Sequence, residues 1–407
     1  MTRRPRPDLS RRDFIALSAL GIAGCAVSRT GGTKNEVDRM LYVGTYTEKT
    51  GSKGIYYLRF SPGSGALAVA GVAAETVNPS FLTVSPSGLA AFAVNEVGQF
   101  DGHPGGGVTA FARDTASGVL RPLGSEPTNG ADPCYVSIDH SGRFLFVANY
   151  TGGSVAMYPI LPGGAIGAMA AFIQHHGHGP DAERQEGPHA HCVIADPSNR
   201  FVLVSDLGLD RIMVYRFDAA SGTLNTSTAG QGILAPGAGP RHLAFHPGGR
   251  ILYVVNELNS TVTVFRYDAE TGSLTELQTV PAISEPAMAL AGSADAQRAT
   301  KNEPADIHLH PSGRFLYMSN RGYNSISVFA VDATTAMLSP IEVVSCGGDW
   351  PRNFTIDPSG AFLIVANERS SSINSFRIDA STGRLRATGQ SVAVPAPVCL
   401  RWIVERA

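Results

Sequence analysis

The sequence predicts an all-β fold assembled from a repeated unit of four short strands, and three observations lead to this prediction. A segment that begins with Pro, passes through a turn such as Pro-Ser-Gly-Arg and ends in a second apolar strand recurs along the chain. A second segment, made of a β-rich run, a Thr-Gly-like turn and Leu, follows each copy. Apolar residues alternate with a period of two, as at Val262 and Val264, which favours strands over helices.

The number of copies predicts the number of blades. The first segment, an inner hairpin, begins at Pro79, Pro133, Pro188, Pro240, Pro304 and Pro351. The second segment, an outer hairpin, is clearest at 212–224, 262–274 and 373–385, weaker at 108–120, 155–166 and 326–338, and also present at 55–67. Each repeat of roughly 50 residues therefore carries four antiparallel strands with turn residues at both tips, which is typical of a β-propeller blade.

The missing seventh inner hairpin is divided between the two ends of the chain. Residues 41–45 form a second strand without a first, and residues 397–404 form a first strand without a second. Pairing them closes the ring and removes an open sheet edge, which would otherwise favour aggregation. We therefore predict one seven-bladed β-propeller over residues 40–407, closed by the two terminal strands in one blade.

The N-terminal segment is predicted to be an export signal. Ser-Arg-Arg-Asp-Phe-Ile at 10–15 resembles the twin-arginine motif, and the apolar run at 14–24 is too short to span a bilayer. Ile-Ala-Gly-Cys at 22–25 resembles a lipoprotein cleavage box with Cys25 as the lipidated residue; the alternative is plain cleavage a few residues later. The sequence thus predicts a signal at 1–24, a linker at 25–39, and a periplasmic or lipid-anchored protein.

Composition narrows the classes of partner. The formal net charge is −2 and no basic stripe is present, so we expect no nucleic acid. We expect a monomer that contacts membranes only through a lipid on Cys25. The other cysteines show neither zinc-site spacing nor a CxxC pair, and we interpret them as buried small apolar residues: Cys134, Cys192, Cys346 and Cys399.

Two positions of every inner hairpin are expected to share one mouth of the ring. Because the two strands are antiparallel, the start of the first lies beside the end of the second. The residues at these positions are Glu96, Tyr135, Asn149, Tyr150, His189, His191, Asp206, Arg241, His242, Glu257, Asp306, His308, Arg321, Arg352, Asn367 and Glu368. The Pro-Ser-Gly-Arg turns are expected at the opposite mouth.

Arginine, histidine and glutamate gathered at one mouth suit a small anionic ligand. The guanidinium fork matches carboxylate or phosphate, while His and Glu transfer protons near neutral pH. The alternative interpretation is a set of salt bridges between blades.

Several segments resemble the lactonase family of seven-bladed propellers. The segment at 183–191 resembles RQxxPHAH, and similar matches lie at 205–211, 239–247, 255–258, 319–322 and 351–354. The family includes bacterial 6-phosphogluconolactonases and is related to a carboxy-muconate cyclase. One departure is Asp306, where relatives often carry Glu.

The resemblance implies a metal-free lactonase without cofactor and assigns roles to matching residues. His189, Glu257, Arg241 and Arg321 are the implied catalytic groups, and Arg352 is a further anion binder. We add His242, His191 and Asp206 as substrate-binding residues.

The resulting hypothesis is a lactone hydrolase similar to 6-phosphogluconolactonase. His189 takes a proton from the attacking water, Arg241 or Arg321 stabilises the oxyanion, and Glu257 orients a neighbour or acts as the base itself. No GxSxG motif supports a serine nucleophile. The alternatives are a lactonising cyclase or isomerase on the same scaffold, a non-catalytic envelope propeller, and, less favoured, a metal site among the histidines of 175–191.

Overall fold

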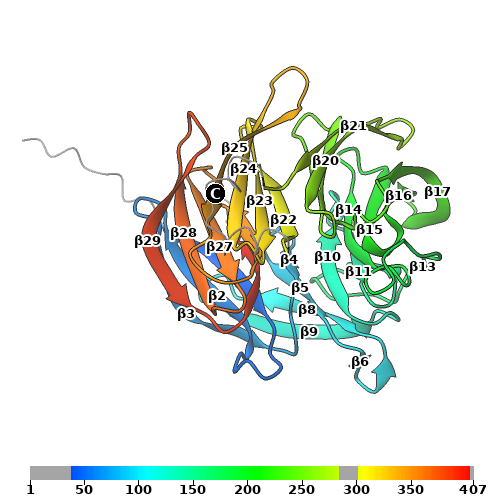
Figure 1. Cartoon of the computed structure of the whole chain (residues 1–407). Coiled ribbons are helices and arrows are strands. Elements are labelled where there is room, and N and C mark those ends of the chain that lie inside the picture. Colours follow the sequence, from blue (N-terminus) through cyan, green and yellow to red (C-terminus); the bar gives the residue numbers. More distant parts are fainter. Residues whose placement is uncertain (1–37, 284–300, 404–407) are drawn as a thin grey trace, which may run out of the picture. The chain divides into compact units, whose positions relative to one another are not determined.

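The computed structural model describes residues 38–283 and 301–403, which form a ring of seven four-stranded antiparallel sheets (Figure 1). The predicted seven-bladed propeller is confirmed. The predicted signal at 1–24, Cys25 and the linker up to residue 37 lie outside the described residues. Within the described ranges, no helix is long and apolar enough to cross a bilayer.

The blades are numbered along the chain, and their strands run from the channel outward. Blade 1 contains β30 (Pro397–Trp402), β1 (Arg39–Thr45), β2 (Gly54–Ser61) and β3 (Ala66–Glu75). Blade 2 contains β4 (Leu82–Val84), β5 (Ala90–Asn95), β8 (Gly107–Arg113) and β9 (Leu120–Pro127), with a ribbon of β6 (Gln99–Phe100) and β7 (His103–Pro104). Blade 3 contains β10 (Pro133–Ile138), β11 (Phe144–Asn149), β12 (Ser154–Pro159) and β13 (Ala171–Gln174).

The remaining blades follow the same order. Blade 4 contains β14 (Ala190–Ala195), β15 (Phe201–Asp206), the short 3₁₀ helix η1 (Leu207–Leu209), β16 (Arg211–Asp218) and β17 (Thr223–Ile233). Blade 5 contains β18 (Pro240–Phe245), β19 (Ile251–Asn256), β20 (Thr261–Tyr267) and β21 (Leu274–Pro281). Blade 6 contains β22 (Glu303–Leu309), β23 (Phe315–Arg321), β24 (Ser325–Val331) and β25 (Leu338–Ser345). Blade 7 contains β26 (Pro351–Ile356), β27 (Phe362–Asn367), β28 (Ser372–Ile378) and β29 (Leu385–Ala393).

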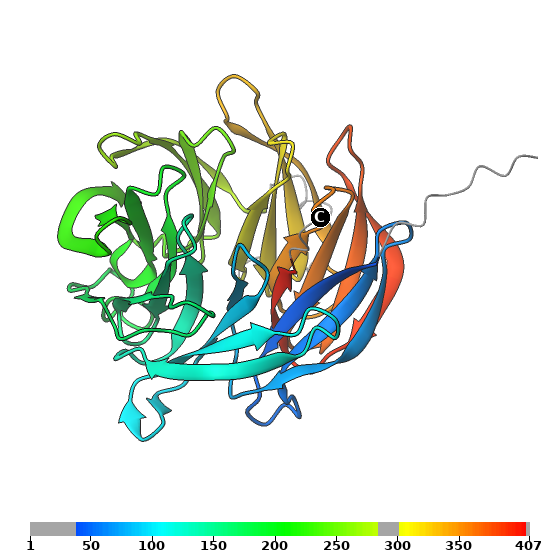
Figure 2. The ribbon, with the colours of Figure 1, turned by 180° about the vertical axis from the view of Figure 1, so that it is seen from behind.

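Blade 1 joins the two ends of the ring as predicted. β1 pairs antiparallel with β30, with Val43 opposite Leu400. Figure 2 shows the blue N-terminal strands beside the red C-terminal strands. Phe60 of this blade packs against Phe362 and Trp402 with ring centroids 5.3 Å apart in both pairs, which ties the closing blade to blade 7.

The outer hairpin predicted at 155–166 is present, but its return strand is interrupted after the turn. β12 ends at Pro159, an isolated bridge joins Ile160 to Ile166, and the fourth strand is β13, which starts only at Ala171. Pro159 lacks an N–H for the ladder, and its carbonyl accepts from the Gly167 N–H at 2.8 Å before regular pairing resumes.

The prediction that four cysteines are buried is confirmed. The thiols of Cys134, Cys192, Cys346 and Cys399 are free and buried. Burial raises the pKa of Cys192 to about 12, so this thiol stays protonated at neutral pH.

One end of the inner hairpins is closed by the same contact in several blades. At the Pro-Ser-Gly-Arg-like turns, an aspartate after the first strand accepts a hydrogen bond from the backbone N–H that begins the second. The distances are 2.8 Å for Asp139, 2.8 Å for Asp196 and 2.7 Å for Asp357. The contact gives the backbone N–H at the turn a hydrogen-bond partner. Because it recurs in three blades, we interpret these aspartates as structural residues.

The other end carries a β-bulge near the start of the inner strand in most blades. The start of the first strand lies opposite the end of the second, as predicted, with Pro133 opposite Asn149 and Ala190 opposite Asp206. The register then shifts, and such a bulge redirects a side chain. The residues inside these shifts are Cys134, His191, Arg241, His242, Ala305, Asp306, Arg352 and Val398.

Candidate active site

A pocket lies at the bulged end of the central channel and draws residues from five blades. Four of the residues predicted at this mouth line it, namely Glu96, Arg241, His242 and Arg352. Its full lining is Ser80, Phe81, Glu96, Cys134, Arg241, His242, Arg352, Asn353 and Val398. Most of these residues lie in or beside a bulge, so the local break in strand pairing builds the pocket.

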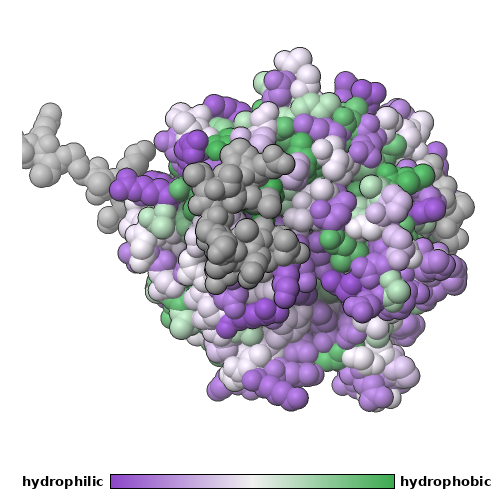
Figure 3. All heavy atoms as spheres, viewed as in Figure 1, coloured by the Kyte–Doolittle hydropathy of each residue, from purple (hydrophilic) through white to green (hydrophobic). Residues whose placement is uncertain are grey.

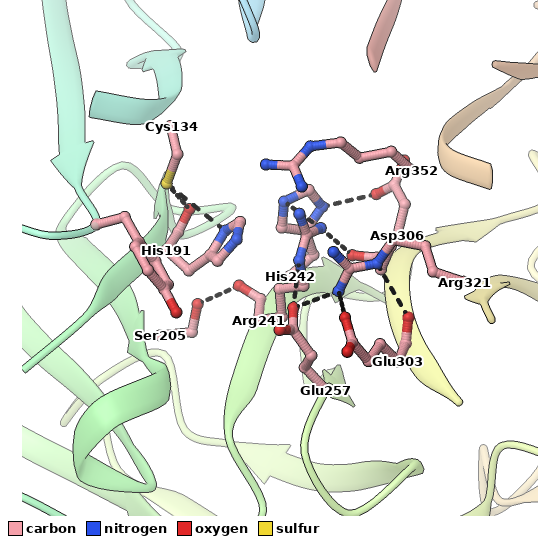
Figure 4. A network of polar contacts seen from close by, with 12 residues as sticks. Cys134, His191, Ser205, Arg241, His242, Glu257, Glu303, Asp306, Arg321 and Arg352 are labelled. Atoms are coloured by element: carbon pink, nitrogen blue, oxygen red, sulfur yellow. Dashed lines mark hydrogen bonds and ion pairs between the residues drawn. The ribbon is translucent and has the colours of Figure 1, made fainter. Parts of the chain in front are cut away.

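Glu257, just after the second strand of blade 5, binds three arginines, of which Arg241 and Arg321 are shown in Figure 4. Its Oε2 lies 2.9 Å from Arg241 Nε and 2.6 Å from Arg321 Nη2, and its Oε1 lies 2.5 Å from Arg184 Nη2. Burial by itself would raise the pKa of Glu257, but the three guanidiniums hold it well below the usual value. Glu257 is therefore an ionised anchor for the arginines.

Across the described ranges, the four arginines of this cluster (Arg184, Arg241, Arg321 and Arg352) pair with three carboxylates, those of Glu257, Glu303 and Glu96. Burial, together with the nearby charges of Arg321 and Arg352, lowers the pKa of Arg241 to about 10, so the group remains a cation at neutral pH. Among the described residues, neither Arg241 Nε nor Arg321 Nη2 makes an aligned hydrogen bond, although both lie within ion-pair distance of Glu257. Both nitrogens face Glu257, so it is the grouping of Arg241, Arg321 and Arg352 that favours an anionic ligand at this mouth.

Arg352 is the least constrained of the pocket cations. In the described part of the chain its one carboxylate contact is with Glu96, at 3.9 Å, and its guanidinium lies 5.3 Å from the centre of the Tyr46 ring. Glu96 is bound more tightly by others, since it accepts hydrogen bonds from Tyr46 at 2.9 Å and from Ser80. Arg352 is thus free to turn its planar fork toward a ligand.

His242 is held by a carboxylate below the pocket. Its Nδ1 lies 2.8 Å from Asp306 Oδ1, while Asp306 Oδ2 contacts His308 Nε2 at 2.9 Å and accepts from Asn353 at 2.6 Å. Burial and the charge of Arg241 lower the pKa of His242 to about 4, so the imidazole is neutral. With Nδ1–H donating to Asp306, its Nε2 lone pair faces Arg241 Nη1 at 3.2 Å.

His189 lies beside this cluster but does not line the pocket. Its ring stacks on Tyr150 with centroids 4.5 Å apart, and its Nδ1 donates to the Tyr150 carbonyl at 3.1 Å. The Tyr150 hydroxyl accepts from Arg184 at 3.3 Å, and Arg184 binds Glu257. The Nδ1 of His189 is used by the carbonyl, and its Nε2 lies 3.4 Å from the exposed Glu186 carboxylate.

Two residues expected to bind substrate are enclosed by protein contacts. Asp206 is fully buried, and its oxygens accept from the His189 backbone N–H at 2.8 Å and contact His175 Nδ1 at 2.6 Å. His191 lies behind the pocket, with its Nδ1 3.7 Å from Cys134 Sγ. Both side chains therefore position neighbours and do not open into the pocket.

Arg184 is the main residue that the sequence analysis did not single out. It lies in the loop between β13 and β14, within the segment 183–191 that resembles the family motif, so a signal was present. The position follows no blade repeat, and only the folded chain brings it to Glu257. Ser80, Cys134 and Asn353 were missed for a simpler reason, because small or neutral residues give no chemical signal.

Fold and pocket together define a seven-bladed propeller with a cation-rich site at one mouth. A family model described as "Lactonase, 7-bladed beta-propeller" matches residues 40–402, and the chain belongs to this family. The chain is 36% identical over 362 residues to the 6-phosphogluconolactonase of Bacillus subtilis, covering 89% of this chain and 97% of the relative.

Two further relatives agree with this membership. The 6-phosphogluconolactonase of Formosa agariphila is 34% identical over 317 residues, which cover 77% of this chain and 85% of that protein. The solved structure of the periplasmic gluconolactonase of Pseudomonas aeruginosa is 34% identical with a TM-score of 0.81, covering 90% of this chain and 99% of the other.

Proposed function

We propose that this protein hydrolyses a sugar lactone that carries an anionic group or yields one, as 6-phosphogluconolactonase does. The observation that carries the proposal is the cluster of Arg241, Arg321 and Arg352 at the bulged mouth, whose charge Glu257 and Glu96 only partly neutralise. Hydrolysis turns a neutral ester into a carboxylate through an oxyanion, and preorganised cations stabilise that change. The 6-phosphogluconolactonase and gluconolactonase relatives support the same reaction class.

The proposed reaction begins with water attacking the lactone carbonyl carbon. His189 Nε2 takes the proton of the water, and Arg241 and Arg321 stabilise the oxyanion. Collapse of the intermediate breaks the ring C–O bond, and the protonated His189 returns the proton to the leaving alkoxide. The product is a hydroxy acid whose new carboxylate remains near the arginines.

His189 is preferred to the other candidate bases on physical grounds. Glu257 has a pKa held well below its usual value, which makes it a weak base. His242 has a pKa lowered to about 4, and its lone pair already faces Arg241. The Nδ1 of His189 donates to a carbonyl, so Nε2 is the nitrogen left to act on the water. Asp206 then serves to hold the His189 backbone.

Arg352 is proposed to bind the phosphate or the hydroxyl end of the substrate. A guanidinium with a carboxylate at 3.9 Å keeps most of its hydrogen-bonding capacity for a ligand. Arg352→Met should therefore raise KM more for 6-phosphogluconolactone than for gluconolactone. An equal change in KM for both lactones would assign Arg352 to the sugar ring instead of the phosphate.

The test of the proposed function is hydrolysis by purified residues 26–407. The panel contains 6-phosphogluconolactone, gluconolactone and a muconolactone, and the variants are His189→Ala and Arg241→Ala. His246→Gln, in a turn at the opposite end, is the matched histidine control. Activity lost in both site variants and kept in the control supports the proposal. A folded protein inactive on every lactone contradicts it and favours a non-catalytic envelope propeller.

The face of the molecule seen in Figure 3 does not itself favour that alternative. On the face seen in Figure 3, the described hydrophobic residues lie in small groups among polar ones, without one broad apolar area. A docking scaffold usually presents a larger continuous patch.

We also propose that the chain is exported by the signal at 1–24, lipidated at Cys25 and monomeric. The periplasmic location of the Pseudomonas aeruginosa relative supports export. Replacement of Arg11 and Arg12 by Lys should retain the protein in the cytoplasm, and Cys25→Ser should release it from membranes. Unchanged fractionation of either variant would contradict the corresponding assignment.

A further inference from the structure

Trp350 has a backbone conformation that bulky residues rarely adopt. Its φ is 65°, in the left-handed region, and it stands directly before the proline that starts the inner hairpin of blade 7. Four other blades show the same conformation at the same position, where the residues are Asn78 (38°), Asp132 (52°), Gly239 (64°) and Ala396 (41°). The conformation therefore belongs to the fold, whereas the large side chain is particular to blade 7.

Neighbouring groups hold Trp350 in this conformation. Its N–H donates to Asn324 Oδ1 at 2.9 Å, and its carbonyl accepts from the Glu368 N–H at 3.0 Å. Asn324 in turn donates to Asp349 at 2.7 Å. These contacts hold a bulky residue in a conformation that suits Asn, Asp or Gly better.

The indole contacts an arginine of the proposed active site. The Arg321 guanidinium lies 5.4 Å from the centre of the Trp350 ring, within cation–π range. The exposed Arg369 packs on the same indole at 3.3 Å. Trp350 also lines a surface hollow with Asp349 and Arg369, and the buried Arg321 does not.

An aromatic face holds a cation without neutralising it. Arg321 already shares Glu257 Oε2 with Arg241 and lies 3.6 Å from Glu303. Another carboxylate would fix the guanidinium but would compete with the developing oxyanion for its N–H groups. The indole restricts the guanidinium without occupying a further N–H group.

We propose that Trp350 is a positioning residue of the active site, retained in a strained conformation because its indole orients Arg321. The inference rests on the proposed lactonase function through the role of Arg321 in that function. It predicts that Trp350 acts on the chemical step more than on substrate binding.

The kinetic test compares Trp350→Asn with Trp350→Phe. The equivalent residues in other blades show that Asn suits this backbone, so Trp350→Asn should fold, which thermal unfolding checks. It should lower kcat about tenfold with KM nearly unchanged, while Trp350→Phe restores most of kcat. Ala396→Gly, at the equivalent position of blade 1, is the control and should leave kcat unchanged. Full activity of folded Trp350→Asn would overturn the inference.

A second readout does not depend on turnover. The chain has two tryptophans, Trp350 and Trp402, so Trp402→Phe leaves Trp350 as the only indole emitter. Titration with 6-phosphogluconate should then change the emission saturably, and Trp350→Phe, which leaves Trp402, should show no change. Absence of the change in the Trp350-only protein, with hydrolysis intact, contradicts the inference. Absence of hydrolysis by the parent protein contradicts the proposed function instead.

Discussion

The two ends of the inner hairpins arise from the same sequence repeat but differ in how regular they are. At the turn end, Asp139, Asp196 and Asp357 make the same contact in three blades, each to the N–H that starts the next strand. At the bulged end, equivalent positions carry different chemistry in different blades. They hold Cys134, His191, Arg241, Asp306, Arg352 and Val398.

This contrast separates structural residues from site residues within one chain. A contact that recurs from blade to blade satisfies a requirement of the blade. Tyr42, Tyr253 and Tyr317 are a further example, since each donates to a carbonyl of the next blade at 2.8, 2.9 and 2.8 Å. A polar group that appears in one blade only is not needed to build the blade. At the bulged mouth, such groups come together in one pocket.

The largest expected effect is at the centre of the mouth, in Glu257→Ala. Removing this carboxylate leaves Arg184, Arg241 and Arg321 without their shared partner. Loss of one partner of a buried charge cluster destabilises a protein by about 3–5 kcal/mol. We expect that loss in urea unfolding, together with a fall in kcat of at least about 10³-fold. A stable and active variant would contradict the claim that the bulged end carries the functional residues.

Asp306→Asn should impair catalysis more than folding. The amide keeps the size of the side chain, but it cannot serve both His242 and His308 as an ionised acceptor, so His242 loses its fixed tautomer. We expect kcat/KM to fall about 10- to 100-fold with a smaller change in stability. Unchanged kinetics in the folded variant would show that Asp306 is only a packing residue.

Acid should destabilise the two ends in different pH ranges. Burial lowers the pKa of His242 to about 4 from 6.5, so the unfolded chain takes up the proton first. The stabilisation is complete above pH 6.5 and is lost as pH falls toward 4, by about 1–3 kcal/mol. At the turn end, the pKa of Asp139 is lowered despite its burial by hydrogen bonds such as that from Ser141, so its contribution is lost only below pH 3.8.

Unfolding free energies measured from pH 7 to pH 3 test this order. His242→Asn should flatten the upper part of the curve and leave the lower part unchanged. A variant with the same slope between pH 6.5 and 4 as the parent would contradict the assignment.

The smallest effect on activity is expected at the turn end, in Asp357→Asn. This carboxylate accepts from the Phe362 N–H and pairs with Arg39 at 2.7 Å, so its loss should cost about 1–3 kcal/mol. Because no substrate reaches this end in our proposal, kcat should not change. A large loss of kcat in the folded variant would place function at both ends.

The sequence predicted the features that repeat from blade to blade and the site residues that stand at the end of a strand. Seven blades and the β1–β30 closure follow from counting hairpins, and Arg241, Glu257 and Arg352 were found because they stand at strand ends. Arg184 was not singled out, since its loop belongs to no repeat and its contact with Glu257 spans 73 residues of sequence. The enclosure of Asp206 by His189 and His175 also depends on packing that no local pattern encodes.

The most direct test of the distinction between the two ends is to locate the product. Crystals of residues 26–407 soaked with 6-phosphogluconate should show the ligand at the bulged mouth. Its carboxylate should contact Arg241 or Arg321, and its phosphate should contact Arg352. Density for the ligand at the turn end of the channel, with the arginine pocket unoccupied at saturating concentration, would contradict the account.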